Sequence, residues 1–147
     1  TARMVFMPGK HQTLFDQYYA DWPAAIDVLQ ALLKEYPTVI TSSGVKAAWY
    51  LGSFDFDLNY SVMKETDTSD EFGLDPRTGR PVISSPESVR QVLQENAPAL
   101  VIIEDYHAND RRAVSVEVVK LLDQMGDRVE TDAKYLKIWV VPDIIRK

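Results

Sequence analysis

The run Ala99–Glu104, with the sequence ALVIIE, is the feature that most constrains the fold. Its first five residues are all apolar and do not alternate with polar residues, which is typical of a strand covered on both faces. Such strands occur mainly in parallel sheets whose crossover helices pack on both sides. The run therefore predicts an α/β fold with this strand near the centre of the sheet.

The segment Thr38–Asp57 fits the same fold. Thr38–Thr41 is predicted to be a buried strand, and the small polar turn Ser42-Ser43-Gly44 leads into a short helix at Val45–Leu51. A further strand is expected at Phe56–Val62. A strand that enters a helix through a small turn is the repeating unit of α/β sheets, and ligands usually bind at that turn.

Helix boundaries are clearest where capping residues and proline occur together. Asp21 and Pro23 predict the start of an amphipathic helix, which Pro37 ends. Ser85-Pro86-Glu87 predicts a second start, and Asn109 or Asp110 is expected to cap a third helix that Gly126 closes. The remaining strands are expected at Pro81–Ser84, Asp127–Thr131 and Tyr135–Val141.

This order of elements predicts a three-layer α/β/α sandwich with a mainly parallel, Rossmann-like sheet and an antiparallel C-terminal strand pair. We expect a single domain over residues 1–147, with an extended lead-in at 1–20 and a long acidic loop at 63–80. Because the chain starts at Thr1 rather than at a methionine, we expect a fragment or a mature form with targeting information upstream.

Composition narrows the classes of function. The formal net charge of −6 disfavours nucleic acid or anionic lipid as the main partner, since both attract basic surfaces. The absence of cysteine excludes disulfides and thiolate metal sites. No apolar run approaches the roughly 20 residues that span a bilayer.

Four sequence blocks resemble the C-terminal soluble domain of bacterial integral-membrane glycosyltransferases, the polytopic enzymes that are related to protein O-mannosyltransferases and use polyprenyl-phosphate-linked sugars. The blocks are Tyr19-Ala20-Asp21-Trp22-Pro23, Tyr50-Leu51-Gly52 with Asp55-Phe56, Thr78–Val89, and Leu100–Asp105. The resemblance implies an accessory domain on the periplasmic or extracellular face of the membrane, as part of an integral membrane protein. It carries over no catalytic residue, because the catalytic motif of the family has no matching position in this chain.

Asp55-Phe56-Asp57 has the Asp-x-Asp form with which some nucleotide-sugar glycosyltransferases hold a divalent cation. The pattern is short and common, so Asp55 and Asp57 are only weak candidates for metal ligands. We favour a surface-facing acid pair with Phe54 and Phe56 packed inward. Neither a metal nor a cofactor is expected.

The candidate ligand-binding residues are Ser42, Ser43, Gly44, Asp105 and His107. The turn could bind an anion through its N–H groups, although a plain helix cap explains the serines better. His107 with Asp105 could act as a base, and Ser42 or Ser43 would complete a triad, but no G-x-S-x-G motif surrounds either serine.

The aromatic residues Trp22, Trp49, Tyr50 and Trp139 suit the flat face of a pyranose ring, but we expect Trp22 and Trp139 to belong to the core. Of the adjacent pair Trp49 and Tyr50, one is expected to be exposed.

Three functions follow from the sequence. The first is a non-catalytic extracytoplasmic accessory domain of a membrane glycosyltransferase that uses a lipid-linked sugar donor. Its expected partners are the membrane-embedded catalytic part of the same polypeptide and the sugar or lipid-linked sugar, not nucleic acid. The alternatives are a stand-alone module that binds a sugar phosphate or nucleotide at Ser42–Gly44, and a small enzyme that uses Asp105 and His107.

Overall fold

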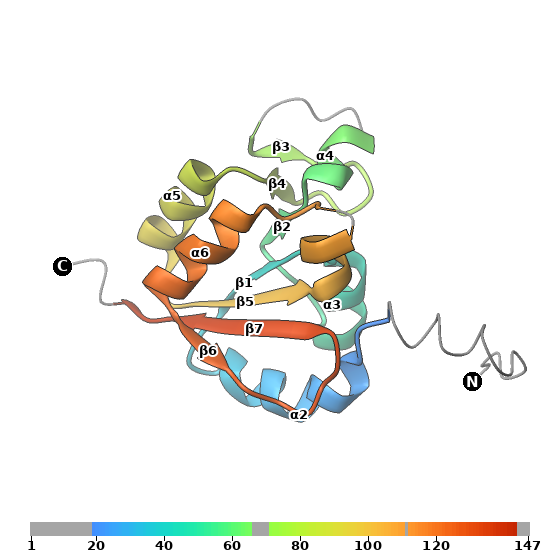
Figure 1. The fold of residues 1–147 in the computed structure, drawn as a ribbon, viewed down its shortest axis with the longest axis vertical. Helices are drawn as coiled ribbons and strands as arrows, with labels where there is room; N and C mark the ends of the chain where they lie inside the picture. Colours follow the sequence, from blue (N-terminus) through green and yellow to red (C-terminus); the bar gives the residue numbers. More distant parts are fainter. Residues whose placement is uncertain (1–18, 66–70, 111, 144–147) are drawn as a thin grey trace, which may run out of the picture.

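A seven-stranded mixed sheet forms the centre of the computed structural model, which describes residues 19–65, 71–110 and 112–143 (Figure 1). The strand order is β3-β4-β2-β1-β5-β7-β6. The strands are β1 (Thr38–Thr41), β2 (Phe56–Leu58), β3 (Gly73–Leu74), β4 (Pro81–Ile83), β5 (Ala99–Glu104), β6 (Asp127–Val129) and β7 (Leu136–Val141).

Four neighbouring strands, β4, β2, β1 and β5, run parallel. The sheet becomes antiparallel at β7 and β6, and also at β3 on the opposite edge. The predicted α/β class, the parallel centre and the antiparallel C-terminal pair are therefore confirmed.

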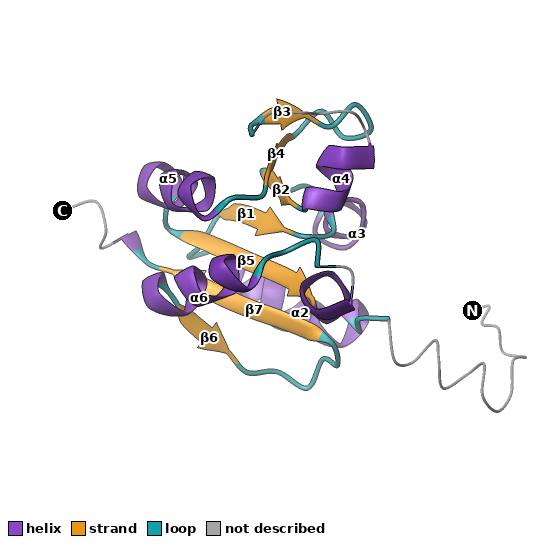
Figure 2. Cartoon of the chain, turned by 45° about the horizontal axis from the view of Figure 1, so that its top comes forward, coloured by secondary structure: helices purple, strands orange, loops and turns teal. Residues whose placement is uncertain are grey.

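Helices pack on both faces of the sheet (Figures 1 and 2). They are α2 (Trp22–Leu33), α3 (Gly44–Leu51), α4 (Tyr60–Glu65), α5 (Pro86–Asn96) and α6 (Val116–Met125), with a π-helical turn η2 (Tyr106–Asp110) after β5.

The core consists of two hydrophobic clusters, one on each face of the sheet. Alternate residues of β5 enter different clusters: Leu100 and Ile102 pack with α2 and α3, while Val101 and Ile103 pack with α5 and α6. This alternation follows from the pleat of a strand, whose successive side chains point to opposite faces. All six residues of β5 are buried, as the apolar run predicts.

The expected helix starts at Asp21 and Ser85 are confirmed. The Asp21 side chain accepts a hydrogen bond from the Ala24 amide, and Ser85 Oγ accepts one from the Ser88 amide. The expected cap at Asn109 or Asp110 is wrong, because Ser115 is the N-cap of α6 and its Oγ accepts from the Val118 amide at 3.2 Å.

The expected strand Phe56–Val62 is also wrong in its second half. β2 ends at Leu58, and Asn59 Oδ1 accepts a hydrogen bond from the Val62 amide, which starts α4 instead. The connection predicted over 63–80 contains the end of α4 and the short strand β3, while residues 66–70 lie outside the described part. Of the expected lead-in at 1–20, only Tyr19 and Ala20 are described.

Candidate functional site

Two predicted site residues meet where β1 and β5 end. The Ser42 amide donates to the Ile102 carbonyl, and Ser42 Oγ accepts a 3.0 Å hydrogen bond from the Glu104 amide. The same Oγ lies 2.9 Å from His107 Nδ1. This is the carboxyl edge of the sheet, where the sequence placed both the turn and the loop after β5.

The π-helical turn η2 holds His107 in place. The backbone carbonyl oxygen of His107 accepts hydrogen bonds from the Ala113 amide at 2.7 Å and the Val114 amide at 3.1 Å. Asp105, one residue before η2, is held differently: its carboxylate accepts from Lys137 Nζ at 2.6 Å, and its amide donates to the Tyr135 carbonyl. The acid of the hypothetical triad is therefore engaged by Lys137.

Ser42 is unsuited to nucleophilic attack in this arrangement. Only 1% of the residue is exposed, and its Oγ already serves both the Glu104 amide and the His107 ring. A nucleophile needs an accessible oxygen beside its base. The contact between Ser42 and His107 therefore connects the end of β1 to the turn after β5.

Ser43 and Gly44 begin α3. The Ser43 amide donates to Thr41 Oγ1 at 3.1 Å, and the Ser43 side chain forms no capping hydrogen bond. A Cβ atom added to Gly44 would lie 2.5 Å from Phe54 Cζ and 2.9 Å from Asp57 Oδ2. The start of α3 is therefore packed directly against Phe54 and Asp57.

Asp57 is a buried acid, so the prediction that it faces the surface is wrong. It is 2% exposed, and its Oδ1 has no hydrogen-bond partner among the described residues. Burial, reinforced by the negative charge of Asp75 and opposed by Arg77, raises the pKa of Asp57 to about 7. Burial favours the protonated, uncharged form of the Asp57 carboxyl group.

Asp55 and Asp57 do not converge on one ligand position. Asp55 Oδ2 accepts a hydrogen bond from the Val39 amide at 2.8 Å and so joins β1 to the start of β2. Within residues 19–65, 71–110 and 112–143, no group of three or more His, Asp or Glu side chains is arranged to hold a metal ion.

A further acid, Glu104, lies between the sheet edge and an open pocket. Its Oε2 accepts a 2.7 Å hydrogen bond from Trp22 Nε1 and lies 3.1 Å from Lys46 Nζ. The Glu104 side chain is 5% exposed, whereas that of Lys46 is 40% exposed. The buried Glu104 carboxylate therefore has two donors, of which Lys46 is partly exposed to solvent.

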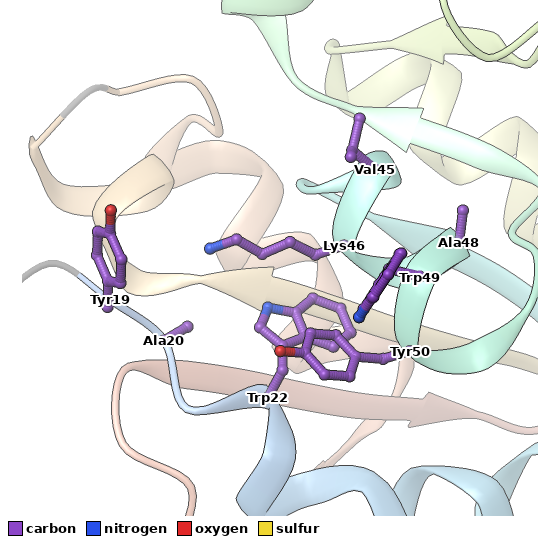
Figure 3. A pocket seen from close by; sticks show the side chains of 8 residues that line it. All are labelled: Tyr19, Ala20, Trp22, Val45, Lys46, Ala48, Trp49 and Tyr50. Atoms are coloured by element: carbon purple, nitrogen blue, oxygen red, sulfur yellow. The ribbon is translucent and has the colours of Figure 1, made fainter. Parts of the chain in front are cut away.

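The pocket beside this pair has a volume of about 550 Å³ (Figure 3). Trp22 and Tyr50 stack in it with ring centroids 5.9 Å apart and planes at 8°. In Figure 3, Tyr19 and Trp49 stand on opposite sides, and the Lys46 side chain extends toward Tyr19, whose ring centroid lies 5.4 Å from Lys46 Nζ.

The expectations for the aromatic residues are confirmed. Trp22 and Trp139 are buried, and Trp49 is 81% exposed beside a half-buried Tyr50. Tyr19 and Lys46 were not predicted as site residues. The available signal was the spacing on α3, since Lys46 and Tyr50, four residues apart, share one face of the helix.

No helix in the described part of the chain has the length and apolar character required to cross a bilayer. Comparison of the chain with protein-family models, with curated proteins and with solved structures gave no match.

Proposed function

We propose that this chain is a non-catalytic extracytoplasmic accessory domain of a membrane glycosyltransferase that takes its sugar from a lipid-linked donor. Its partner is the membrane-embedded catalytic part of the same polypeptide. In the same proposal, the fold is a three-layer, Rossmann-like α/β/α sandwich that presents one face to this partner or to the sugar.

One observation carries the proposal: three of the four blocks that resemble this family meet at one place. Trp22 from the first block stacks on Tyr50 from the second. Glu104 from the fourth block accepts the hydrogen bond of the Trp22 indole, although the two residues are 82 positions apart. The three segments therefore meet beside an open pocket, and pockets of this kind are where small ligands bind.

The non-catalytic part of the proposal rests on how the polar groups are used. Ser42, Glu104 and Asp105 all have partners within the domain, at distances of 2.6–3.1 Å. Such pairing stabilises and orients the fold. Because these three side chains are already paired within the domain, we assign them a structural role rather than a role in binding or converting a substrate.

The reading frame upstream of Thr1 provides the first test. We expect several apolar segments of roughly 20 residues, each long enough to cross a bilayer. A start codon directly before this domain, with no such segments, would refute the proposal.

An activity measurement provides the second test. Membranes that contain the full-length protein are expected to transfer sugar from a polyprenyl-phosphate donor, and the isolated domain is expected to be inactive. Removal of residues 19–143 should raise KM more than it lowers kcat, because binding is lost and the catalytic groups remain. Sugar transfer by the isolated domain would contradict a non-catalytic role.

A further inference from the structure

We infer that the pocket formed by Tyr19, Trp22, Lys46, Trp49 and Tyr50 binds the neutral pyranose ring of a sugar. This inference rests on the proposed function, which makes a sugar available to the domain, and it adds the site and the chemical class of the ligand.

The size of the pocket suits a small molecule. Its volume of about 550 Å³ lies within the range of roughly 300–1,000 Å³ that small-molecule sites occupy. The pocket is lined mostly by aromatic and apolar side chains, with Lys46 as its charged residue. An apolar lining with a few placed polar groups is the usual composition of a ligand site.

The exposed rings suit the apolar face of a pyranose. Trp49 is 81% and Tyr19 62% exposed, and in Figure 3 they flank the opening from opposite sides. The C–H groups on one face of a pyranose pack well against a flat aromatic ring, and Trp offers the largest such surface. The stacked pair Trp22–Tyr50 fixes the position of the pocket relative to α2 and α3.

The ion pair on the wall selects a neutral, hydroxyl-rich ligand. Lys46 Nζ is neutralised by the buried Glu104 carboxylate at 3.1 Å, so the pair offers little net charge to a phosphate. A purely apolar partner would remove water from this charged pair without replacing its hydrogen bonds, which is costly. Sugar hydroxyls can accept hydrogen bonds from the Lys46 ammonium and so replace the lost water.

The experiment uses the 147-residue chain and three kinds of probe. Methyl α-mannopyranoside and methyl β-glucopyranoside test for a neutral pyranose, cyclohexanol tests for general apolar binding, and inorganic phosphate tests for an anion. The readout is the indole N–H resonance of each tryptophan. Trp139 serves as an internal reference, because it is buried and belongs to the cluster on the other face of the sheet.

A methyl glycoside is expected to shift the Trp49 and Trp22 resonances in a saturable way and to leave Trp139 unchanged. Trp49→Ala should raise Kd about tenfold, and Lys46→Met should also raise it. The matched control is Tyr60→Ala, which removes a 53% exposed aromatic ring outside the pocket and should leave Kd unchanged. Binding of the polyprenyl-phosphate sugar with the same dependence on Trp49 would identify the donor rather than a free glycan as the source.

Three results would overturn the inference: no shift with either glycoside, an equal shift with cyclohexanol, or saturation by phosphate alone. An equal response to cyclohexanol would identify an apolar docking surface instead. If the upstream membrane spans are present and no glycoside binds, only this inference fails. If glycosides bind and no spans exist, the proposed function fails and the pocket assignment stands.

Discussion

The indole N–H of Trp22 donates a 2.7 Å hydrogen bond to the carboxylate of Glu104, and both groups are buried. Trp22 begins α2 and Glu104 ends β5, so this bond fixes the first described helix to the centre of the sheet. A hydrogen bond to a charged group contributes about 1.5–3 kcal/mol, and Trp22→Phe would remove this one while Lys46 still pairs with the carboxylate.

Trp22→Phe should therefore lower the free energy of unfolding by more than the same substitution at Trp139 does. The matched control is Trp139→Phe, which removes a bond to Asp123 of 2.8 Å, but the Asp123 side chain is 52% exposed and can be solvated again. We expect Trp22→Phe to cost about 1–2 kcal/mol more, measured by urea unfolding. Equal costs would show that Glu104 does not depend on the indole.

The raised pKa of Asp57 predicts that stability falls with rising pH. Between the unfolded value of 3.8 and the folded value of about 7, the native state holds a proton that the unfolded state has released. The stabilising contribution of this proton is complete at low pH and is lost as pH rises through about 7. Its size is about 4 kcal/mol, from about three pKa units at 1.36 kcal/mol each.

Asp57→Asn removes this titration while it preserves the shape of the side chain. The variant should match the wild type near pH 4 and exceed it in stability at pH 8, as measured by urea unfolding across this range. The titration of Asp75 does not overlap with that of Asp57. Burial alone would raise the pKa of Asp75, but the hydrogen bonds and the charge of Arg77 lower it below its ordinary value, so Asp75 titrates at more acidic pH. A constant difference between variant and wild type from pH 4 to 8 would contradict the assignment.

Gly44 and Gly52, at the two ends of α3, should respond differently to substitution. Gly44→Ala places a Cβ atom against Phe54 and Asp57 and should cost about 1–3 kcal/mol by overpacking, despite the higher helix propensity of alanine. Gly52 has a φ of 93° and open space around it, so Gly52→Ala should cost about 1–2 kcal/mol through backbone strain alone.

Asparagine separates these two causes, because it tolerates the left-handed region better than alanine does. Gly52→Asn should recover part of the stability lost in Gly52→Ala. Gly44→Asn should be at least as destabilising as Gly44→Ala. Thermal unfolding of the four variants measures both effects, and the same pattern at both glycines would contradict the explanation.

Ser42→Ala should destabilise the protein, because it leaves the buried Glu104 amide without its acceptor and removes the contact with His107. The expected cost is about 1–3 kcal/mol. Ser43→Ala is the control, since its side chain makes no capping bond, and it should change stability by less than about 0.5 kcal/mol. If denaturant unfolding ranked the two variants in reverse, the structural role of Ser42 would be wrong.

Local signals predicted much of the fold. The start of α2 at Asp21, the start of α5 at Ser85 and the burial of β5 each depend on a few neighbouring residues. The end of β2 depends partly on a local cap, since Asn59 Oδ1 accepts from the Val62 amide, and partly on a contact with a distant segment. Tyr60, the first residue of α4, donates its amide to the Ala113 carbonyl, a contact between distant segments that local periodicity does not reveal.

For the candidate site, the sequence predicted the location at one edge of the sheet but not the contacts of the individual side chains. The rule that parallel strands present their carboxyl ends at one edge placed Ser42 near His107, 65 residues away. The partners of individual charges were not predictable: the sequence gives no indication that Lys137 holds Asp105 or that Lys46 holds Glu104. These pairings depend on the exact approach of strands and helices in three dimensions.

The two edge strands of the sheet restrict how this domain can associate with itself. One edge is β3, with only two residues, and the other is β6, three residues that begin with the charged Asp127 and Arg128. Short and charged edges are poor templates for an added strand. Growth of the sheet from one molecule into the next through these two described edges is therefore disfavoured.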